Sequence, residues 1–295
     1  MQKLANFFKI LYNQSTKHSF SCNHRTSQSI LMTKPLIPAQ RRDRIQEYLA
    51  VNRIARTVDL CDILETSEAT VRRDLEWLEQ EGILERTHGG AILSQRMTFE
   101  PGYQQRAQIN PEEKRSIGAL AASMIDKDDI VFINSGTTTT QVIRHTRNDP
   151  SISIFTNNLS GAIEVGEPGF QYYMVGGEFQ PRSNSLAGRF AVENIGQVYA
   201  TKAIIGVDGM SLKHGCTVPS NVEAETVRQM IKHTKGEIIV VADHSKWGVV
   251  SNFQIAAIDE IDKLITDAEF DRSAYESLEA RGVQIMVAAA NPAIA

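Results

Sequence analysis

Residues 66–78 read Thr66-Ser-Glu-Ala-Thr-Val-Arg-Arg-Asp-Leu-Glu-Trp-Leu78, and their pattern is typical of a short amphipathic helix. Apolar side chains recur at intervals of four and three residues, the spacing that places them on one side of a helix. A hydroxyl residue at the start, Thr66 or Ser67, can cap the first turn. We therefore expect a helix that buries the stripe formed by Val71, Leu75 and Leu78.

The polar residues of this helix lie off the apolar stripe and near the helix start. A guanidinium group can bind a guanine edge or grip a phosphate, and a hydroxyl can bond to either. The pattern therefore predicts a helix that reads the major groove of DNA, although an amphipathic helix with a solvated charged face has the same periodicity. The residues concerned are Thr70, Arg72 and Arg73.

The flanking sequence favours the DNA-reading interpretation. Residues 42–51 and 58–64 each have the apolar periodicity of a helix, and Gly82 stands where helices commonly stop. Residues 83–92 alternate in polarity and turn on a pair of glycines, which predicts a small hairpin. Three helices followed by a hairpin form a winged helix-turn-helix, whose wing would carry Arg86 and His88 toward the DNA backbone.

The same residues resemble the amino-terminal signature of the DeoR family of bacterial transcriptional regulators. That signature reads S-x-x-T-[IV]-R-R-D-L and then L-x-R-x-H-G-G-A, and the run from Ser67 to Ala91 meets every position. We also expect Arg41 and Arg42 to lie toward the DNA phosphates. The resemblance implies operator binding through Ser67, Thr70, Arg72, Arg73, Arg86 and His88.

Length and composition predict two domains and give no sign of a membrane-spanning helix. The 295 residues are 42% hydrophobic, yet no apolar run reaches the roughly 18 residues that span a bilayer. Cys22, Cys61 and Cys216 are widely spaced, which fits a reducing cytoplasm and no metal site.

The net charge is −4, and residues 39–98 hold nine Lys and Arg against eleven Asp and Glu. DNA binding must therefore depend on where the arginines lie and on a homo-oligomer, a dimer or tetramer, that holds several half-sites.

The amino-terminal leader differs in composition from the rest of the chain. Residues 1–42 contain seven Lys and Arg and no acidic residue, and they are rich in Ser, Asn and Gln. Such a segment fits a transit peptide, a disordered basic arm or a start codon placed too far upstream. Met32 stands at the distance from the first helix that the family resemblance implies, which favours the upstream start.

The remaining sequence alternates strands and helices. Residues 99–106 are loosely patterned and predict a linker, and Asn110 with Pro111 predicts a capped helix start. Repeated strand–helix units argue for an open parallel sheet covered by helices. The expected strands are residues 129–133, 151–155, 171–175, 202–207, 237–241, 262–265 and 283–287.

These patterns predict an α/β protein with an N-terminal winged helix-turn-helix followed by a Rossmann-like open parallel sheet as the effector domain. The boundaries that we expect are a leader over 1–38, a DNA-binding domain over 39–95, a linker over 96–109 and an effector domain over 110–288.

Polar and glycine motifs follow the expected strands, where ligands bind in open parallel sheets. The first is a glycine with successive hydroxyls before a helix that starts near Gln141, an arrangement that can cradle an anion. It lacks the lysine of a P-loop, so a nucleoside triphosphate is not expected. Neutral donors, acids and a lysine on one rim suit a phosphorylated polyol. The candidate residues are Ser135, Gly136, Thr137, Thr138, Thr139, Asn157, Asn158, Gly177, Asp208, Glu223, Arg228 and Lys246.

Each motif also has a structural interpretation, as a helix cap, a turn or a solvated surface residue. The strand-end motifs together resemble the DeoR-type effector domain, which is similar in fold to ribose-5-phosphate isomerase and glucosamine-6-phosphate deaminase. The resemblance implies a sugar-phosphate effector, no cofactor and no catalytic residues. We expect a cytoplasmic repressor of a carbohydrate-catabolic operon that a phosphorylated sugar releases from double-stranded DNA. The alternative is isomerase-like activity, with Asp208, Glu223 and Lys246 as its candidate residues.

Overall fold

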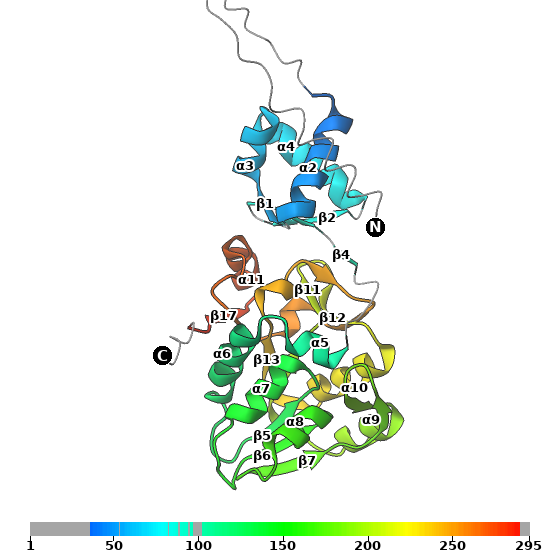
Figure 1. Ribbon diagram of the computed structural model, residues 1–295, viewed down its shortest axis with the longest axis vertical. Helices are drawn as coiled ribbons and strands as arrows, with labels where there is room; N and C mark the ends of the chain where they lie inside the picture. Colours follow the sequence, from blue (N-terminus) through cyan, green and yellow to red (C-terminus); the bar gives the residue numbers. More distant parts are fainter. Residues whose placement is uncertain are drawn as a thin grey trace, which may run out of the picture. The chain divides into compact units, whose positions relative to one another are not determined.

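The computed structural model describes residues 36–52, 54–81, 83–87, 89–93, 95–96 and 102–289 of the chain (Figure 1). The leader predicted over 1–38 therefore lies almost wholly outside the described residues, as do Cys22 and His88. Within the described ranges, no helix combines the length and the apolar character needed to cross a membrane.

The amino-terminal helices form as the winged helix-turn-helix prediction requires. Ser67 caps the third helix, because its hydroxyl accepts a hydrogen bond from the Thr70 amide at 3.4 Å. The joint before it turns on Glu65, which has a left-handed φ of 48°. The apolar stripe of this helix is buried in the core of the domain. The helices are α2 (Pro38–Asn52), α3 (Thr57–Leu64) and α4 (Glu68–Gln80).

The wing is an antiparallel hairpin of β2 (Leu84–Thr87) and β3 (Gly90–Leu93), as predicted. A further strand, β1 (Ile54–Arg56), pairs with β3 and was not expected, because three residues are too few to show an alternating pattern. The approach of β1 requires a glycine at position 90. A Cβ atom on Gly90 would lie 2.0 Å from the carbonyl oxygen of Ala55.

The larger part of the chain is built on a seven-stranded sheet, and every neighbouring pair of strands in it is parallel. All seven expected strands form, so the predicted fold class is confirmed. The strand order is β17-β16-β13-β10-β5-β6-β7, and it runs outward in both directions from the β5–β10 pair. The strands are β5 (Ile130–Ile133), β6 (Ser153–Thr156), β7 (Gln171–Met174), β10 (Ala200–Gly206), β13 (Thr234–Val241), β16 (Lys263–Thr266) and β17 (Gln284–Val287).

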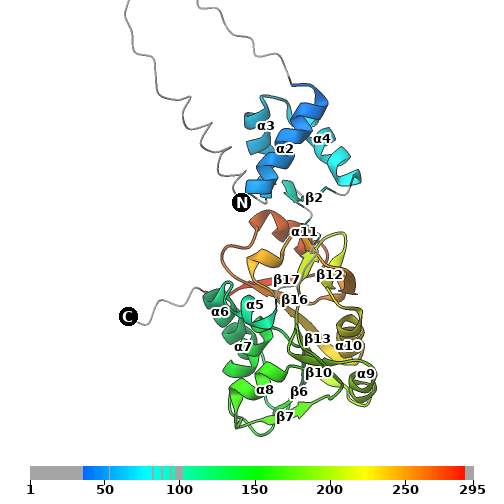
Figure 2. The same cartoon turned by 45° about the vertical axis from the view of Figure 1, so that its right-hand side comes forward.

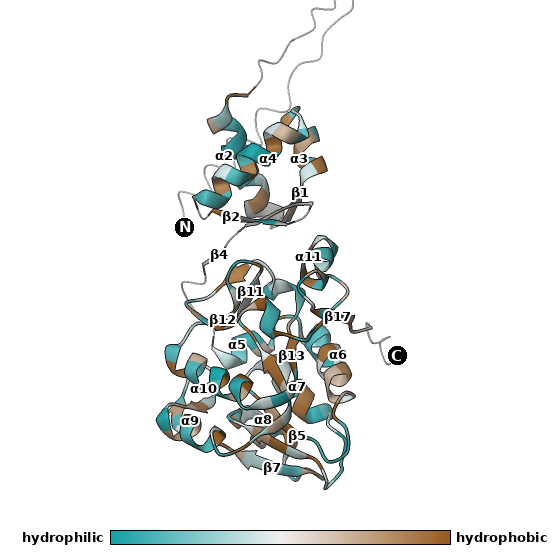
Figure 3. Cartoon of the chain, turned by 180° about the vertical axis from the view of Figure 1, so that it is seen from behind, coloured by the Kyte–Doolittle hydropathy of each residue, from teal (hydrophilic) through white to brown (hydrophobic). Residues whose placement is uncertain are grey.

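Helices cover both faces of this sheet (Figure 2). Three of them, α6 to α8, lie on one face, and α9 and α10 lie on the other. The buried apolar residues accordingly form two clusters, one under each layer. Figure 3 shows hydrophobic strands between helices whose outer sides are hydrophilic. The helices are α6 (Pro111–Ala122), α7 (Thr137–His145), α8 (Leu159–Val165), α9 (Arg189–Ile195) and α10 (Asn221–Lys232).

Several short elements were not expected from the sequence. Helix α5 (Tyr103–Ala107) forms within the loosely patterned segment that was predicted as a linker. The other unexpected strands are the hairpin β8 (Glu178–Gln180) and β9 (Ser185–Ala187), the antiparallel sheet β11 (Gly209–Ser211), β12 (Gly215–Val218) and β15 (Phe253–Ala256), and the parallel pair β4 (Gln95–Arg96) and β14 (Val249–Val250). The remaining short helices are η1 (His244–Lys246), η2 (Ile258–Glu260), η3 (Arg272–Ala274) and α11 (Tyr275–Glu279).

Candidate functional site

The exposed side of α4 carries the residues expected to read DNA. Arg72 and Arg73 are exposed, while Thr70 is half-buried. The Ser67 and Thr70 hydroxyls lie 3.0 Å apart at the helix start. Arg72 pairs with Glu68, one turn earlier, with 2.5 Å between Nη2 and Oε1. Of the two arginines, Arg72 must therefore leave Glu68 before it can reach DNA. We expect Arg73 to reach DNA directly.

Arg41 and Arg42, which we expected to lie toward the DNA phosphates, are instead paired within the domain. Both guanidinium groups turn onto the buried carboxylate of Asp74, at 2.6 Å from Arg41 Nε and 3.3 Å from Arg42 Nε. The Arg42 guanidinium also stacks 4.0 Å above the Trp77 ring. These two arginines hold the start of α2 against α4, because a buried carboxylate needs paired charges to offset its lost hydration.

The wing contributes one described candidate. Arg86 is exposed on β2, and its backbone amide donates a hydrogen bond to Glu79 Oε1 at 3.1 Å. This contact ties the wing to the end of α4, so the guanidinium of Arg86 projects from a fixed strand. His88 lies outside the described residues, and its contact with DNA stays a prediction.

A cleft lies at the carboxyl ends of β5 and β10, where the strand order changes direction. Asn134 joins the two strand ends, because it accepts a hydrogen bond from the Gly206 amide at 2.7 Å and donates one to the Gly206 carbonyl at 2.9 Å. Ligands bind at such switch points in open parallel sheets. Seven of the predicted effector residues line this cleft: Ser135, Gly136, Thr137, Thr138, Asp208, Glu223 and Lys246.

The start of helix α7 forms one wall of the cleft. The helix begins at Thr137, four residues before the start expected from the sequence, and no side chain caps it at Gly136. Amide groups of a first helical turn have no partner within the helix and carry partial positive charge. The Thr139 and Thr140 hydroxyls donate back to the Gly136 carbonyl at 3.1 and 2.8 Å. The wall therefore offers backbone donors suited to an anion.

Another part of the cleft wall combines charges of both signs. Arg106, from α5, places Nη1 2.7 Å from Asp208 Oδ1, and both side chains are buried. Glu223, at the start of α10, hydrogen-bonds to the Ser183 hydroxyl, which also contacts Ser185 at 2.8 Å. Burial raises the pKa of Glu223, an effect that the hydrogen bond from Ser183 opposes and the Asp208 charge reinforces. The wall thus presents hydrogen-bonding oxygens beside a guanidinium group.

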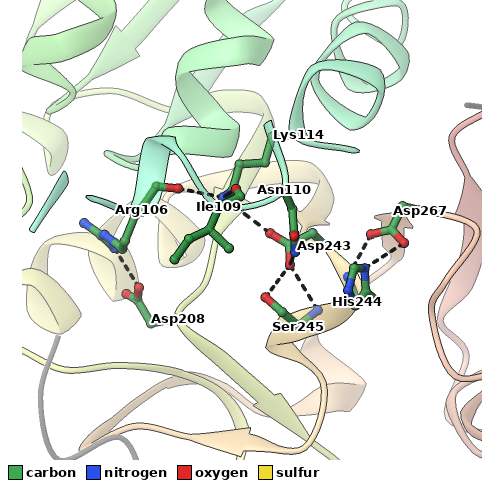
Figure 4. Close-up of polar contacts among 9 residues, drawn as sticks. All are labelled: Arg106, Ile109, Asn110, Lys114, Asp208, Asp243, His244, Ser245 and Asp267. Carbon is green, nitrogen blue, oxygen red and sulfur yellow. Dashed lines mark hydrogen bonds and ion pairs between the residues drawn. The ribbon is translucent and has the colours of Figure 1, made fainter. Parts of the chain in front are cut away.

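A second ionic cluster is centred on Asp243, three residues before Lys246 in the sequence (Figure 4). Asp243 caps η1 by accepting from the Ser245 amide at 3.0 Å, and Asn110 donates to it at 3.1 Å. The buried ammonium group of Lys114 lies 3.7 Å from Asp243 Oδ2 and donates to the Arg106 carbonyl at 2.8 Å and to the Ile109 carbonyl. Burial lowers the pKa of Lys114 despite the Asp243 charge. The cluster fastens the segment between α5 and α6 to the loop that carries Lys246.

Five predicted effector residues do not line the cleft. The Asn157 side chain accepts from the Ser135 amide at 2.8 Å and so supports the loop from behind. Asn158 is buried and caps α8 through the Gly161 amide at 2.9 Å. Arg228 is turned away, with Nε 2.8 Å from the Gln254 carbonyl. Thr139 bonds to its own helix start, and Gly177 lies against the Ala187 backbone.

The structure adds residues that sequence reasoning missed. Arg106 and Ser183 line the cleft, and both come from segments without a strand-end motif. The partner of Arg106 lies 102 residues further along the chain, so no local pattern marks the pair. Asn134 also lines the cleft and was not among the predicted residues. Across the described residues, no group of three or more His, Cys, Asp or Glu side chains is placed to hold a metal ion.

Asp243 makes the domain sensitive to acid. Burial pushes its pKa upward, but the Lys246 charge, the Ser245 hydrogen bond and the Lys114 charge together hold the pKa below its usual value. A carboxyl group with a lowered pKa stabilises the fold above the unfolded-state pKa, and this stabilisation is lost as the pH falls through the folded-state pKa. We expect Asp243→Asn to lower the melting temperature at pH 7 and to flatten its fall between pH 5 and pH 3. Thermal melts followed by Trp247 fluorescence in a Trp77→Phe background measure both, and an unchanged slope would contradict the expectation.

Comparisons with known proteins agree with the two-part architecture. The family model described as the DeoR-like helix-turn-helix domain matches residues 41–96, and the DeoR C terminal sensor domain matches residues 109–268. Among solved structures, a ribose 5-phosphate isomerase from Methanocaldococcus jannaschii is 13% identical, with a TM-score of 0.32 over 47% of this chain and 55% of that chain. A likeness at that level says nothing about activity.

Curated relatives match along nearly their whole length. The HTH-type transcriptional regulator GlpR of Haloferax volcanii is 33% identical over 85% of this chain and 98% of its own. The HTH-type transcriptional repressor GlcR of Bacillus subtilis is 34% identical over 82% and 93%, respectively. These relatives are transcriptional regulators, which confirms the prediction of a regulator and not an enzyme. The chain belongs to the DeoR family of DNA-binding transcriptional regulators.

Proposed function

We propose that this regulator represses a carbohydrate operon and is released from its operator when a phosphorylated sugar binds the cleft at the β5–β10 switch point. The observation that carries the proposal is the pairing of the uncapped start of α7 with Lys246 and Arg106 around one cleft. A phosphate group suits this combination, because backbone amides, an ammonium group and a guanidinium group all bind its oxygens.

The acidic residues of the cleft support a sugar as the remainder of the ligand. The carboxyl oxygens of Asp208 and Glu223 can accept hydrogen bonds, and sugar hydroxyls can donate them. Two positive side chains and two acidic ones line the same cleft, so a ligand with an anionic end and a hydroxylated end fits better than a simple anion.

Repression is the favoured direction of control. One relative, GlcR, is named a transcriptional repressor, and a second is named a putative repressor of the aga operon of Escherichia coli O157:H7, with 30% identity over 84% of this chain and 93% of its own.

The DNA-binding segment lacks a basic excess, since residues 39–98 hold more acids than bases. Stable operator binding therefore calls for a homo-oligomer that places several recognition helices on DNA, acting in the cytoplasm.

A binding screen tests the proposal. Operator fragments are first selected from genomic DNA with the purified protein, and fluorescence anisotropy then measures their affinity with five added compounds: ribose 5-phosphate, glucose 6-phosphate, fructose 1-phosphate, fructose 6-phosphate and glycerol 3-phosphate. We expect at least one to weaken operator binding by a factor on the order of ten or more. The unphosphorylated sugars should have no effect, because they lack the anion that the α7 start binds.

A double variant links that response to the cleft. Thr137→Ala combined with Lys246→Ala should keep wild-type operator affinity and lose the response to the active compound. Lys213→Ala, at an exposed lysine outside the cleft, is the matched control and should respond like the wild type. A double variant that still responds in full would place the effector elsewhere, and steady turnover of a sugar phosphate by the purified protein would overturn the sensor function.

A further inference from the structure

The guanidinium group in the cleft comes from the segment that follows the DNA-binding domain. Arg106 lies on α5, and only residues 94–102 separate the end of β3 in the wing from the start of that helix. Helix α5 is held to the effector domain at both ends. The Tyr103 hydroxyl donates to Thr140 at 2.9 Å, and the Arg106 carbonyl accepts from the buried Lys114 ammonium group at 2.8 Å.

The enclosed part of the cleft is small, and Arg106 is one of the residues that line it. It measures about 30 Å³, which is room for one or two water molecules, and the rest of the cleft is open to solvent. Small-molecule pockets are typically about 300 Å³ or larger. Helix α7 and strand β10, which also border the cleft, belong to the packed layers of helices and sheet. Arg106 stands on a five-residue helix, so the movement of its side chain and of α5 is the simplest way to open the cleft.

The ion pair between Arg106 and Asp208 is also the contact that a phosphate can best replace. The pair is buried and joins Nη1 to Oδ1 at 2.7 Å (Figure 4). A guanidinium group binds a phosphate with two parallel hydrogen bonds, and a phosphate carries more charge than a carboxylate. Asp208, once released, can accept a hydrogen bond from a sugar hydroxyl. The exchange leaves neither partner unpaired.

We propose that Arg106 couples effector binding to DNA binding by exchanging Asp208 for the phosphate of the ligand, which shifts α5 and the segment that leads to the wing. This inference rests on the proposed function and assigns its signalling residue. A second contact follows the same route, since β14, three residues after Lys246, pairs with β4 between the wing and α5. Both positive side chains of the cleft therefore adjoin the connection to the DNA-binding domain.

The decisive measurement separates the affinity for the sugar phosphate from the change in operator affinity that the bound sugar phosphate causes. Arg106→Gln, Asp208→Asn and the control Arg115→Gln, an exposed arginine of α6, are compared with the wild type. Calorimetry gives the affinity for the active sugar phosphate of the screen, and anisotropy gives operator affinity with and without a saturating amount of it. Arg106→Gln should bind the sugar phosphate about tenfold more weakly and, at saturation, change operator affinity less than about twofold. Arg115→Gln should match the wild type.

The two cleft variants have distinct expected results. Asp208→Asn removes the partner that holds Arg106 in the ligand-free state, so its operator affinity should fall without any sugar phosphate. Full wild-type coupling at saturation in Arg106→Gln would overturn the proposal, because a residue that only contacts the ligand changes affinity and not the saturated effect. Ligand-free operator affinity equal to that of the wild type in Asp208→Asn would overturn it as well.

A ligand-free measurement keeps the inference separate from the proposed function. Hydrogen–deuterium exchange of the α5 amides should be faster by a factor on the order of ten in Arg106→Gln and Asp208→Asn than in the wild type and Arg115→Gln. If no compound in the screen acts on the wild type, the proposed function fails, while faster exchange still supports the α5 tie. Unchanged exchange contradicts the inference even where a sugar phosphate releases the DNA.

Discussion

Arg73→Ala is expected to weaken operator binding by a factor on the order of 100 while the DNA-binding domain stays folded. Arg73 is exposed on α4, and its neighbours Val71 and Leu75 hold the helix through their buried side chains. A good arginine contact with a base contributes about 1–3 kcal/mol, and a dimer loses it at both half-sites. Arg72→Ala should also weaken binding, although Arg72 must first leave Glu68, an exposed pair that contributes less than about 1 kcal/mol.

The salt dependence of Arg73→Ala distinguishes the two ways in which Arg73 can contact DNA. Loss of a phosphate contact lowers the slope of log affinity against log salt by about one and affects all sequences alike. Loss of a base contact leaves the slope unchanged and relaxes the preference at one operator position. Footprinting and anisotropy at several salt concentrations measure both, with Arg115→Ala as the control. An intact footprint in Arg73→Ala would mean that the reading face of α4 is placed wrongly.

The sheet was predictable because its signal is local. Each of the seven strands is a short apolar run such as residues 130–133, and a polar or helical segment follows it. The hairpin of β8 and β9, strand β11 and helix α9 gave no such signal, because none of them is a continuous apolar run, and the packing around them sets their conformation. The threonine run illustrates the difference. Its position was predicted, but the start of α7 within it depends on contacts of Gly136 that only the fold supplies.

The cleft was predictable only where it follows strand ends. Asp208 and residues 135–138, at the start of α7, line it because the carboxyl ends of β5 and β10 meet there. Arg228 was selected with Glu223 because both lie on α10. Five residues along a helix correspond to a rotation of about 140°, so the two side chains point to different sides. Helical geometry alone would have excluded Arg228. Arg106 could not be found in this way, since its role depends on a contact across the fold.

The second large effect concerns Asp74, which the signature places between the DNA-reading arginine pair and Leu75. Its carboxylate is 2% exposed and receives Arg41 Nε at 2.6 Å and Arg42 Nε at 3.3 Å. Removing one partner of a buried ion pair costs about 3–5 kcal/mol. Because the two arginines are partly exposed, we expect Asp74→Ala to lower the free energy of unfolding of the DNA-binding domain by about 3 kcal/mol. Operator affinity should fall with it, since α4 loses its tie to α2.

A matched ion pair on the same domain provides the control. Asp59 accepts from Arg56 with 2.8 Å between Oδ1 and Nη2, and both side chains lie near the surface. Asp59→Ala should leave the free energy of unfolding almost unchanged, because water screens exposed charges. Urea denaturation followed by Trp77 fluorescence reports on this domain, since the Trp77 ring lies under Arg42; Trp247→Phe removes the only other tryptophan. Equal losses in Asp74→Ala and Asp59→Ala would show that the buried carboxylate does not hold α4. A loss confined to Asp74→Ala would explain the aspartate in the signature as the residue that fixes the recognition helix.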